Sequence, residues 1–365
     1  MIITFPNMGN VAFAARALCQ GLEIPYVMPE KNNKGTLVTG AYYSPEEICL
    51  PFKIMMGNFL ECIERGADTI LFVGSCGPCR FGEYSELMMK ILRKMEHDID
   101  FIVFDMSPEI GIGEIRRRLG KVLERSPVSL ARKLSAVKKA MKIQYLCDRL
   151  DRAAYLKAGY EARKGGCKRL LNEYKARLYE CQSPEEALNI LKLYVKKLAS
   201  IEIDKSKKPI KIAIIGEIYT VIEPFSNLNI EEKLMDYGVS SERMLTPSWW
   251  VKDTALKPLK LNSLRVSRAA AKYLPYPVGG HCKECVGEAY LAGKKAMDGA
   301  IQILPMGCMP EIIAKSILPT IQKDTNLPVL TLIVDEVTGE AGFITRVEAF
   351  LDMLSSRRKK PDMAS

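Results

Sequence analysis

The sequence lacks the marks of an exported or membrane-spanning protein. It opens Met-Ile-Ile-Thr-Phe-Pro without a basic start, and no apolar run reaches the length needed to cross a bilayer. We therefore expect a cytoplasmic protein without a membrane partner. The 365 residues, of which 48% are hydrophobic, are enough for two domains with buried cores.

Motifs for dinucleotides and for nucleic acid are also missing. Gly111-x-Gly113 lacks the rest of a dinucleotide fingerprint. Residues 107–208 carry 25 Lys and Arg against 12 Asp and Glu, while the rest of the chain carries 28 against 31. No recognition motif for nucleic acid accompanies this basic segment, so we do not expect nucleic acid as the partner. An acidic partner, a homodimer contact, substrate phosphates or a solvated helical face each account for it.

Cysteine is abundant, with 11 residues. An odd number without an export signal argues against a disulfide framework. Six cysteines form two similar triplets, each with one Cys-x-x-Cys pair and one long interval. The interval is 26 residues between Cys49 and Cys76, and 25 residues between Cys282 and Cys308. The triplets are Cys49, Cys76 and Cys79, and Cys282, Cys285 and Cys308. The other five lie in helical patterns and are expected to be small buried hydrophobic residues: Cys19, Cys62, Cys147, Cys167 and Cys181.

The alternation of apolar runs with amphipathic stretches predicts an α/β protein with two parallel-sheet domains. We expect an N-terminal α/β domain at 1–106, a basic helical insert at 107–208, a C-terminal α/β domain at 209–354 and a disordered tail at 355–365. The expected strands are Ile2–Phe5, Ile24–Met28, Thr69–Val73, Phe101–Phe104, Ile210–Ile215, Ala300–Leu304 and Val329–Val334. The expected helices are Val11–Gln20, Glu46–Arg65, Tyr84–Met95, Ile110–Glu124, Leu130–Ala158, Pro184–Ala199, Ile230–Tyr237, Glu284–Met297, Pro310–Gln322 and Phe343–Leu354.

The two triplets occupy corresponding places in the two α/β domains. Cys76 and Cys308 follow predicted strands, and ligands of open α/β sheets bind beyond the carboxyl ends of strands. Cys49 and Cys282 open predicted helices at the same edge. Two such edges facing each other across a cleft would bring six thiols together.

Thiols in this arrangement suit an iron–sulfur cluster. Zinc is the main alternative, but structural zinc sites combine Cys-x-x-Cys pairs that lie close in sequence, and these ligands spread from residue 49 to 308. The Cys76-Gly-Pro-Cys79 stretch also resembles a dithiol redox pair, which would leave the second triplet without a role.

Several neighbours of the cysteines suit a bound anionic cofactor. Gly74 and Gly77 free the backbone to approach sulfur and donate N–H groups. Lys53 and Arg80 can offset negative charge, and Arg80 is a further candidate cofactor contact. His281, beside Cys282, is either a structural hydrogen-bond partner or a proton donor. Lys53, Arg80 and His281 are therefore the candidates for catalysis, and three glutamates near the cysteines are candidate caps or pocket acids: Glu83, Glu288 and Glu311.

Four motifs together resemble the 2-hydroxyacyl-CoA dehydratase and benzoyl-CoA reductase superfamily. They are Cys49-Leu-Pro-Phe-Lys53, Gly74-Ser-Cys-Gly-Pro-Cys-Arg-Phe-Gly82, Gly216-Glu-Ile-Tyr219 and Met306-Gly-Cys-Met-Pro-Glu311. The stretch Asp335-Glu-Val-Thr-Gly-Glu-Ala-Gly342 is similar to the subgroup related to acyl-CoA dehydratase activases. The resemblance implies tandem Rossmann-like or flavodoxin-like domains around an iron–sulfur cluster. It also implies a partner, an ATP-hydrolysing activase with its own 4Fe–4S cluster.

The chain departs from that subgroup at one motif. The subgroup commonly has Gly-Gly-His-Gly, whereas this chain has Gly279-Gly-His-Cys-Lys-Glu-Cys-Val-Gly-Glu288. Without the extra cysteine pair, Cys49, Cys76, Cys79 and Cys308 would ligate a single 4Fe–4S cube. With it, the six thiolates resemble those of double-cubane proteins, in which two cubes share a sulfide and each takes three cysteines.

Three functions follow from these expectations. The favoured one is an anaerobic oxidoreductase of the double-cubane type, with an 8Fe–9S cluster, that takes low-potential electrons from the activase and reduces a small substrate. The second is a dehydratase-type subunit acting on a 2-hydroxyacyl-CoA thioester with a single 4Fe–4S cluster. The third is a cluster carrier or electron relay without catalytic activity, and a zinc-stabilised structural protein remains as the plainest alternative.

Overall fold

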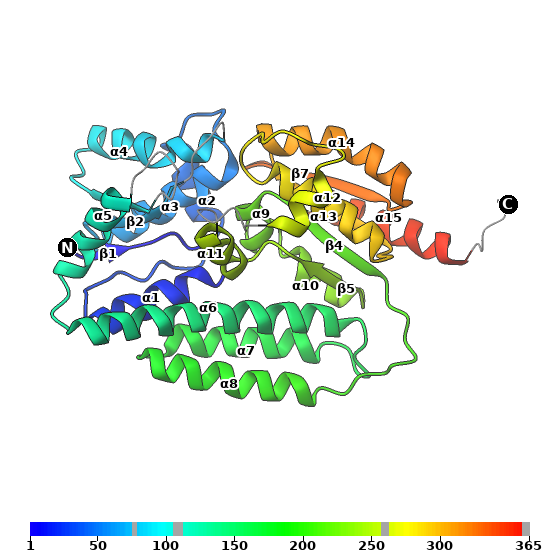
Figure 1. Cartoon of the computed structure of the whole chain (residues 1–365), viewed down its shortest axis with the longest axis horizontal. Helices are drawn as coiled ribbons and strands as arrows, with labels where there is room; N and C mark the ends of the chain where they lie inside the picture. Colours follow the sequence, from blue (N-terminus) through cyan, green and yellow to red (C-terminus); the bar gives the residue numbers. More distant parts are fainter. Residues whose placement is uncertain (75–78, 105–111, 257–262, 360–365) are drawn as a thin grey trace. The chain divides into compact units, whose positions relative to one another are not determined.

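The computed structural model describes residues 1–74, 79–104, 112–256 and 263–359 (Figure 1). The chain divides into two compact units. Unit 1 comprises Met1–Asp151, Leu171–Ala199 and Thr246–Asn262, and unit 2 comprises Arg152–Leu170, Ser200–Leu245 and Ser263–Ser365. Each unit contains an all-parallel sheet with helices, which confirms the predicted α/β class.

The sheet of unit 1 has the order β1-β2-β3 among the described residues. Its strands are Ile3–Thr4, Thr69–Val73 and Asp100–Phe104. The strand predicted at Ile24–Met28 forms only an isolated parallel bridge between Ile3 and Tyr26. Pro25 has no N–H to donate and offers only its carbonyl, which the Ile3 amide contacts at 3.0 Å, so this segment cannot extend a regular ladder.

Helices α1 (Val11–Leu22), α2 (Lys34–Tyr42), α3 (Leu50–Glu64) and α4 (Tyr84–Lys94) belong to unit 1, and α2 is not among the predicted helices. The axes of α2 and α3 cross closely because glycine stands at the contact on each side. A Cβ atom added at Gly40 would lie 1.7 Å from the Lys53 carbonyl oxygen, and one added at Gly57 would lie 1.9 Å from the Thr36 carbonyl oxygen. Glycine is therefore required at both positions.

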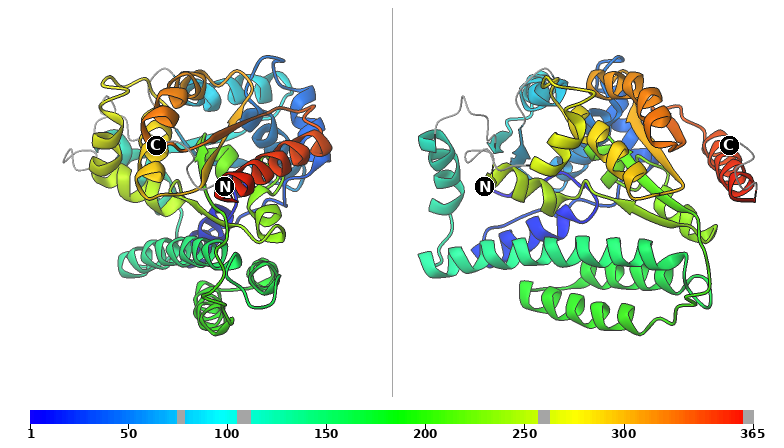
Figure 2. Two further views of the ribbon diagram at one scale, coloured as in Figure 1. Left: turned by 90° about the vertical axis from the view of Figure 1, so that its right-hand side faces the viewer. Right: turned by 45° about the vertical axis from the view of Figure 1, so that its right-hand side comes forward.

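The basic segment is helical, as predicted, but it does not form a unit of its own. It comprises α5 (Ile112–Glu124), α6 (Leu130–Ala158), α7 (Gly166–Glu180) and α8 (Pro184–Ser200). Of these, α7 is not among the predicted helices. Figures 1 and 2 show α7 and α8 running alongside α6.

Buried polar contacts explain why this segment is shared between the units. In unit 1, the Asp151 carboxylate of α6 accepts hydrogen bonds from Asn10 Nδ2 at 2.8 Å and from the Tyr174 hydroxyl. In unit 2, the Ser240 hydroxyl donates to the Leu156 carbonyl at 2.9 Å. Near the C-terminal end of α6, Asp151 is thus bonded within unit 1 and Leu156 within unit 2.

The sheet of unit 2 has the order β5-β4-β6-β7, where β5 is an unpredicted edge strand. The strands are β4 (Lys211–Gly216), β5 (Ser240–Arg243), β6 (Gly299–Pro305) and β7 (Val329–Val334). Every residue of β6 is buried, as expected for a strand covered on both faces of a parallel sheet. The helices are α9 (Ile218–Ile222), α10 (Ile230–Asp236), α12 (Leu264–Ala270), α13 (Cys282–Lys294), α14 (Met309–Thr325) and α15 (Glu340–Lys359), and α11 (Pro247–Leu256) belongs to unit 1.

The C-terminal helix is longer than predicted. The tail was expected to begin at Ser355, but α15 continues to Lys359, and 360–365 lie outside the described residues. Arg358 holds this end: its guanidinium contacts the Asp298 carboxylate and donates to the Lys208 and Pro209 carbonyl oxygens at 2.7 and 2.8 Å. Among the helices that the structure describes, not one has the length and apolar character needed to cross a membrane.

Candidate metal centre

The N-terminal triplet lies at the starts of helices in unit 1. Cys49 is the N-cap of α3 and is 7% exposed, and half-buried Cys79 is the N-cap of the short 3₁₀ helix η1 (Arg80–Glu83). Neither side chain caps its helix by a hydrogen bond, and helix N-termini favour negative charge. Cys76 and Gly77 lie outside the described residues.

Two basic side chains tie the segment before Cys49 to its surroundings. The buried Lys53 ammonium donates to the Glu46 carbonyl oxygen at 2.9 Å. The Arg80 guanidinium donates to the Glu47 carbonyl oxygen at 2.8 Å. Arg80 follows Cys79 directly, so this bond brings the segments that carry Cys49 and Cys79 together.

An aromatic cluster that was not predicted from the sequence lies next to Cys79 and the start of α3. Phe52 meets Tyr84 edge to face with 5.0 Å between ring centroids, and Phe81 stacks on Phe72 at 5.5 Å and tilts against Tyr84 at 5.0 Å. These rings come from α3, β2, η1 and α4. They pack the helix starts that carry Cys49 and Cys79 against the end of the sheet.

The amide of Gly74, expected to donate to a cofactor sulfur, has a partner in the sheet. This amide donates to the Phe104 carbonyl oxygen at 2.9 Å and thereby continues the pairing of β2 with β3. That N–H group is engaged in the sheet and is not available to a cofactor sulfur.

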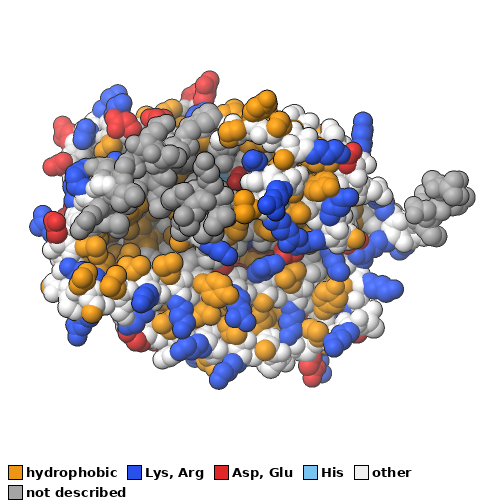
Figure 3. Space-filling view, viewed as in Figure 1, with side chains coloured by type: hydrophobic (Ala, Val, Ile, Leu, Met, Phe, Trp, Pro, Cys, Tyr) orange, Lys and Arg blue, Asp and Glu red, His pale blue; other side chains and the backbone are white. Residues whose placement is uncertain are grey.

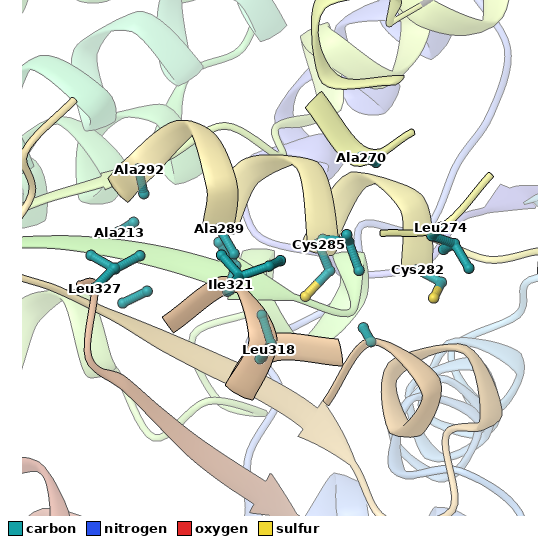
Figure 4. Close-up of a cluster of buried hydrophobic side chains, with 14 residues drawn as sticks. Ala213, Ala270, Leu274, Cys282, Cys285, Ala289, Ala292, Leu318, Ile321 and Leu327 are labelled. Carbon is teal, nitrogen blue, oxygen red and sulfur yellow. The ribbon is translucent and has the colours of Figure 1, made fainter. Parts of the chain in front are cut away.

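The C-terminal triplet belongs to unit 2, where α13 carries two cysteines and α14 follows the third. Cys282 is the first residue of α13, and Cys285 lies one turn further on the same face. Figure 4 shows Cys285 near Leu318 and Ile321 and Cys282 beside Leu274. Both residues are 0% exposed, whereas Cys308 is 5% exposed at the N-cap of α14.

Burial makes Cys282 and Cys285 poor thiolates in this conformation. It raises the pKa of Cys282 to about 12, and it raises the pKa of Cys285 well above its ordinary value, with a further contribution from the Glu311 carboxylate. Metal ligation requires the thiolate. The spacing of Cys282 and Cys285 is also that of a helix core, continued by Ala289 and Ala292.

Cys49 and Cys308 share a local motif that is not among the predicted signals. Each stands two residues before a proline, as Cys49-Leu-Pro51 and Cys308-Met-Pro310, and each is an extended N-cap residue. Proline is favoured in the first turn of a helix, so a Cys-x-Pro sequence places the cysteine at the cap. The motif explains why α3 begins at Leu50 and not at the predicted Glu46. It also explains why Cys308, which follows β6, starts α14.

Buried polar groups surround Cys285. Gln302 Nε2 donates to Glu311 Oε2 at 3.0 Å and lies 3.7 Å from the Cys285 sulfur, while Gln302 Oε1 accepts from the Thr331 hydroxyl at 3.0 Å. Burial raises the pKa of Glu311 to about 8. Glu311 is thus a core acid and not a surface cap.

A second core acid, Glu288, lies on α13. It is 3% exposed and lines a small cavity together with Glu242 and Lys295. Neither of its carboxyl oxygens has a hydrogen-bond partner within the part of the chain that the structure describes. Burial raises its pKa well above the ordinary value. Of the other candidates, Glu83 is the N-cap of α4 without a side-chain cap bond, and His281 is the half-buried N-cap of α13.

Among the described residues, which omit Cys76, no group of three His, Cys, Asp or Glu side chains is arranged to hold a metal ion. Comparison with models of protein families and with the curated proteins finds no match for this chain. What the fold and the geometry define is an α/β protein with two parallel sheets. In each of its units, cysteines lie at helix starts near the carboxyl ends of strands.

Proposed function

We propose that this protein binds an iron–sulfur cluster through its cysteine triplets, receives low-potential electrons from an ATP-hydrolysing activase and reduces a small substrate. The observation that carries the proposal is in unit 1. Cys49 and Cys79 are each the N-cap residue of a helix, and Arg80 joins their segments through the Glu47 carbonyl. Thiolates are the usual ligands of such clusters, and helix N-termini stabilise their negative charge. The bound cluster would supply one-electron transfer.

The residues of this chain would hold and shield the group. Lys53 and Arg80 order the backbone before Cys49, and the rings of Phe52, Phe81 and Tyr84 exclude water from the adjacent core. A dry surrounding strengthens the attraction between the cluster and nearby positive groups.

The number of cubes distinguishes two versions of the proposal. All six thiolates together suit a double-cubane cluster. Cys49, Cys76 and Cys79 suit a single cube, with Cys308 as the fourth thiolate or with one iron left open. The burial of Cys282 and Cys285 and their raised pKa values favour the single cube. This observation makes a dehydratase-type subunit, which would bind its 2-hydroxyacyl-CoA substrate at the open iron, the second candidate.

Iron and sulfide analysis of anaerobically purified protein tests the proposal. About eight iron atoms per chain would support the double-cubane cluster, and about four would support the single cube. An EPR signal after reduction, together with turnover of CoA thioesters by this protein in the presence of an activase, would then identify the dehydratase-type activity. Protein without iron after anaerobic reconstitution, or protein loaded with zinc alone, would refute the proposal.

Single variants assign the ligands. Cys49→Ala and Cys79→Ala should lose the cluster in either version. Cys282→Ala and Cys285→Ala should leave the iron content unchanged with a single cube and lower it with a double cubane. Cys62→Ala is the matched control, since Cys62 is also fully buried, lies on α3 and is outside the triplets. Equal iron loss in all five variants would show that burial, and not ligation, explains the effect.

A further inference from the structure

One face of α6 carries a row of exposed apolar side chains. Its five members are between 40% and 70% exposed, and successive members are three or four residues apart. They are Leu130, Leu134, Val137, Met141 and Tyr145. This spacing places them in one line along the helix, as in the seam of a coiled coil. We call this line the apolar row of α6.

The rest of α6 explains why the row faces outward. Ala136, Ala140, Ile143 and Cys147 are buried and fix the helix against unit 1. The row ends where α11 begins, because the Ser248 amide donates to the buried Asp148 carboxylate at 2.8 Å. A core side chain would be covered at this spacing, so the exposure of five in succession indicates a contact surface.

A second row, of basic residues, runs beside the apolar row. Lys138, Lys142 and Arg149 are exposed, and their spacings of four and seven residues align them on α6. Residues 126–147 contain five Lys and Arg and no Asp or Glu. Figure 3 shows hydrophobic and basic side chains interspersed along the band in which Figure 1 draws α6.

The size and charge of this surface select one kind of partner. From Leu130 to Tyr145 the row is about 22 Å long, and a helix is about 10 Å wide, so the strip is far smaller than the roughly 800 Å² per partner of a stable dimer. A second copy would also bring like charges together. A single helix with an apolar face and an acidic edge matches both the row and its basic neighbour.

We propose that the apolar row of α6 and its adjoining lysines dock an acidic amphipathic helix of a partner protein. The apolar face of that helix covers the row, and its carboxylates lie against Lys138 and Lys142. This inference does not depend on the nature of the metal centre, since the row and the cysteine triplets share no residue.

The test is titration of the full-length protein with a labelled three-heptad peptide that has leucine at a and d and glutamate at e and g. Fluorescence anisotropy should show saturable binding. The same peptide with lysine at e and g should bind at least about tenfold more weakly. Absence of saturable binding at millimolar peptide, or equal binding of both peptides, would overturn the proposal.

Variants locate the binding surface. Leu134→Ser with Met141→Ser, and separately Lys138→Glu with Lys142→Glu, should each weaken binding at least about tenfold. Lys192→Glu with Lys196→Glu on α8 makes the same charge change at exposed positions elsewhere in unit 1 and should leave binding unchanged. An equal effect of this control would remove the assignment to α6.

Two further measurements separate other occupants. Sedimentation velocity would detect a second copy, and flotation with phosphatidylserine vesicles would detect a lipid surface. Self-association or vesicle binding that Leu134→Ser with Met141→Ser abolishes would overturn the proposal in favour of that occupant. Monomeric protein that does not bind the vesicles and does bind the acidic peptide would support the proposal.

Discussion

Gly40→Ala tests the close crossing of α2 and α3, which positions α3 and the cysteine at its start. The added Cβ would lie 1.7 Å from the Lys53 carbonyl oxygen and 2.6 Å from the Gly57 amide nitrogen. Both are backbone atoms of α3, so no side-chain rotation relieves the overlap. Ordinary contact begins at 3.4 Å, and the helices therefore have to separate by about 1.7 Å.

The expected cost follows from two opposing effects. Overpacking of a close contact costs about 1–3 kcal/mol, and a backbone collision belongs at the upper end of that range. Replacement of glycine by alanine inside a helix returns about 0.5–1 kcal/mol. The net loss of about 2 kcal/mol corresponds to a fall in Tm of about 4–8 °C for a domain of this size.

Thermal unfolding followed by calorimetry measures this effect. Gly120→Ala is the control, because Gly120 lies inside α5 and, among the described residues, its added Cβ would meet the Glu124 side chain alone, at 3.5 Å. That variant should be as stable as the natural protein or slightly more stable. If Gly40→Ala melts at the same temperature as Gly120→Ala, the close helix crossing is wrong.

Two further predictions concern unit 2. Because burial raises the pKa of Glu288, its contribution to stability is complete below its unfolded pKa and is lost as the pH rises above that value. Glu288→Gln should therefore flatten the fall in unfolding free energy above about pH 4.5, by up to about 1.4 kcal/mol per pH unit. Urea denaturation at several pH values measures this, and parallel curves for the two proteins would contradict it. Arg358→Ala should lower the free energy of unfolding by about 1–2 kcal/mol, because it removes the contacts with Asp298 and two carbonyl groups. Arg357→Ala removes one bond to Asn326 and should lower it by less than half as much. Equal melting temperatures for the two arginine variants would show that Arg358 does not anchor α15.

Local pattern predicted the regular elements well. The predicted strands Thr69–Val73 and Val329–Val334 and the predicted helix Leu130–Ala158 have the bounds found in the structure. Continuous apolar runs and helical periodicity are short-range signals, so they need no knowledge of distant contacts. The elements that were missed, such as α2 and β5, lack those signals. Gly40 in α2 is required only because the backbone of α3 approaches it closely, and this contact is not visible in the sequence.

The candidate site was predictable in part for the same reason. The sequence placed Cys49 at the start of a helix, and the structure agrees because Pro51 favours the first turn. The carbonyl contacts of Lys53 and Arg80 could not be predicted from local sequence, because they join segments separated by 7 and 33 residues through long side chains.

By itself, the sequence determined many of the strands and helices and that two cysteine triplets recur at their ends, because backbone preference and periodicity are local properties. The tertiary structure decided what those cysteines meet. It buried Cys282 and Cys285 between α13 and α14 while Cys49 and Cys79 came to cap helices, and it left the apolar row of α6 uncovered. Burial depends on which elements pack together, and Cys-x-x-Cys spacing fits a helix core as well as a metal site.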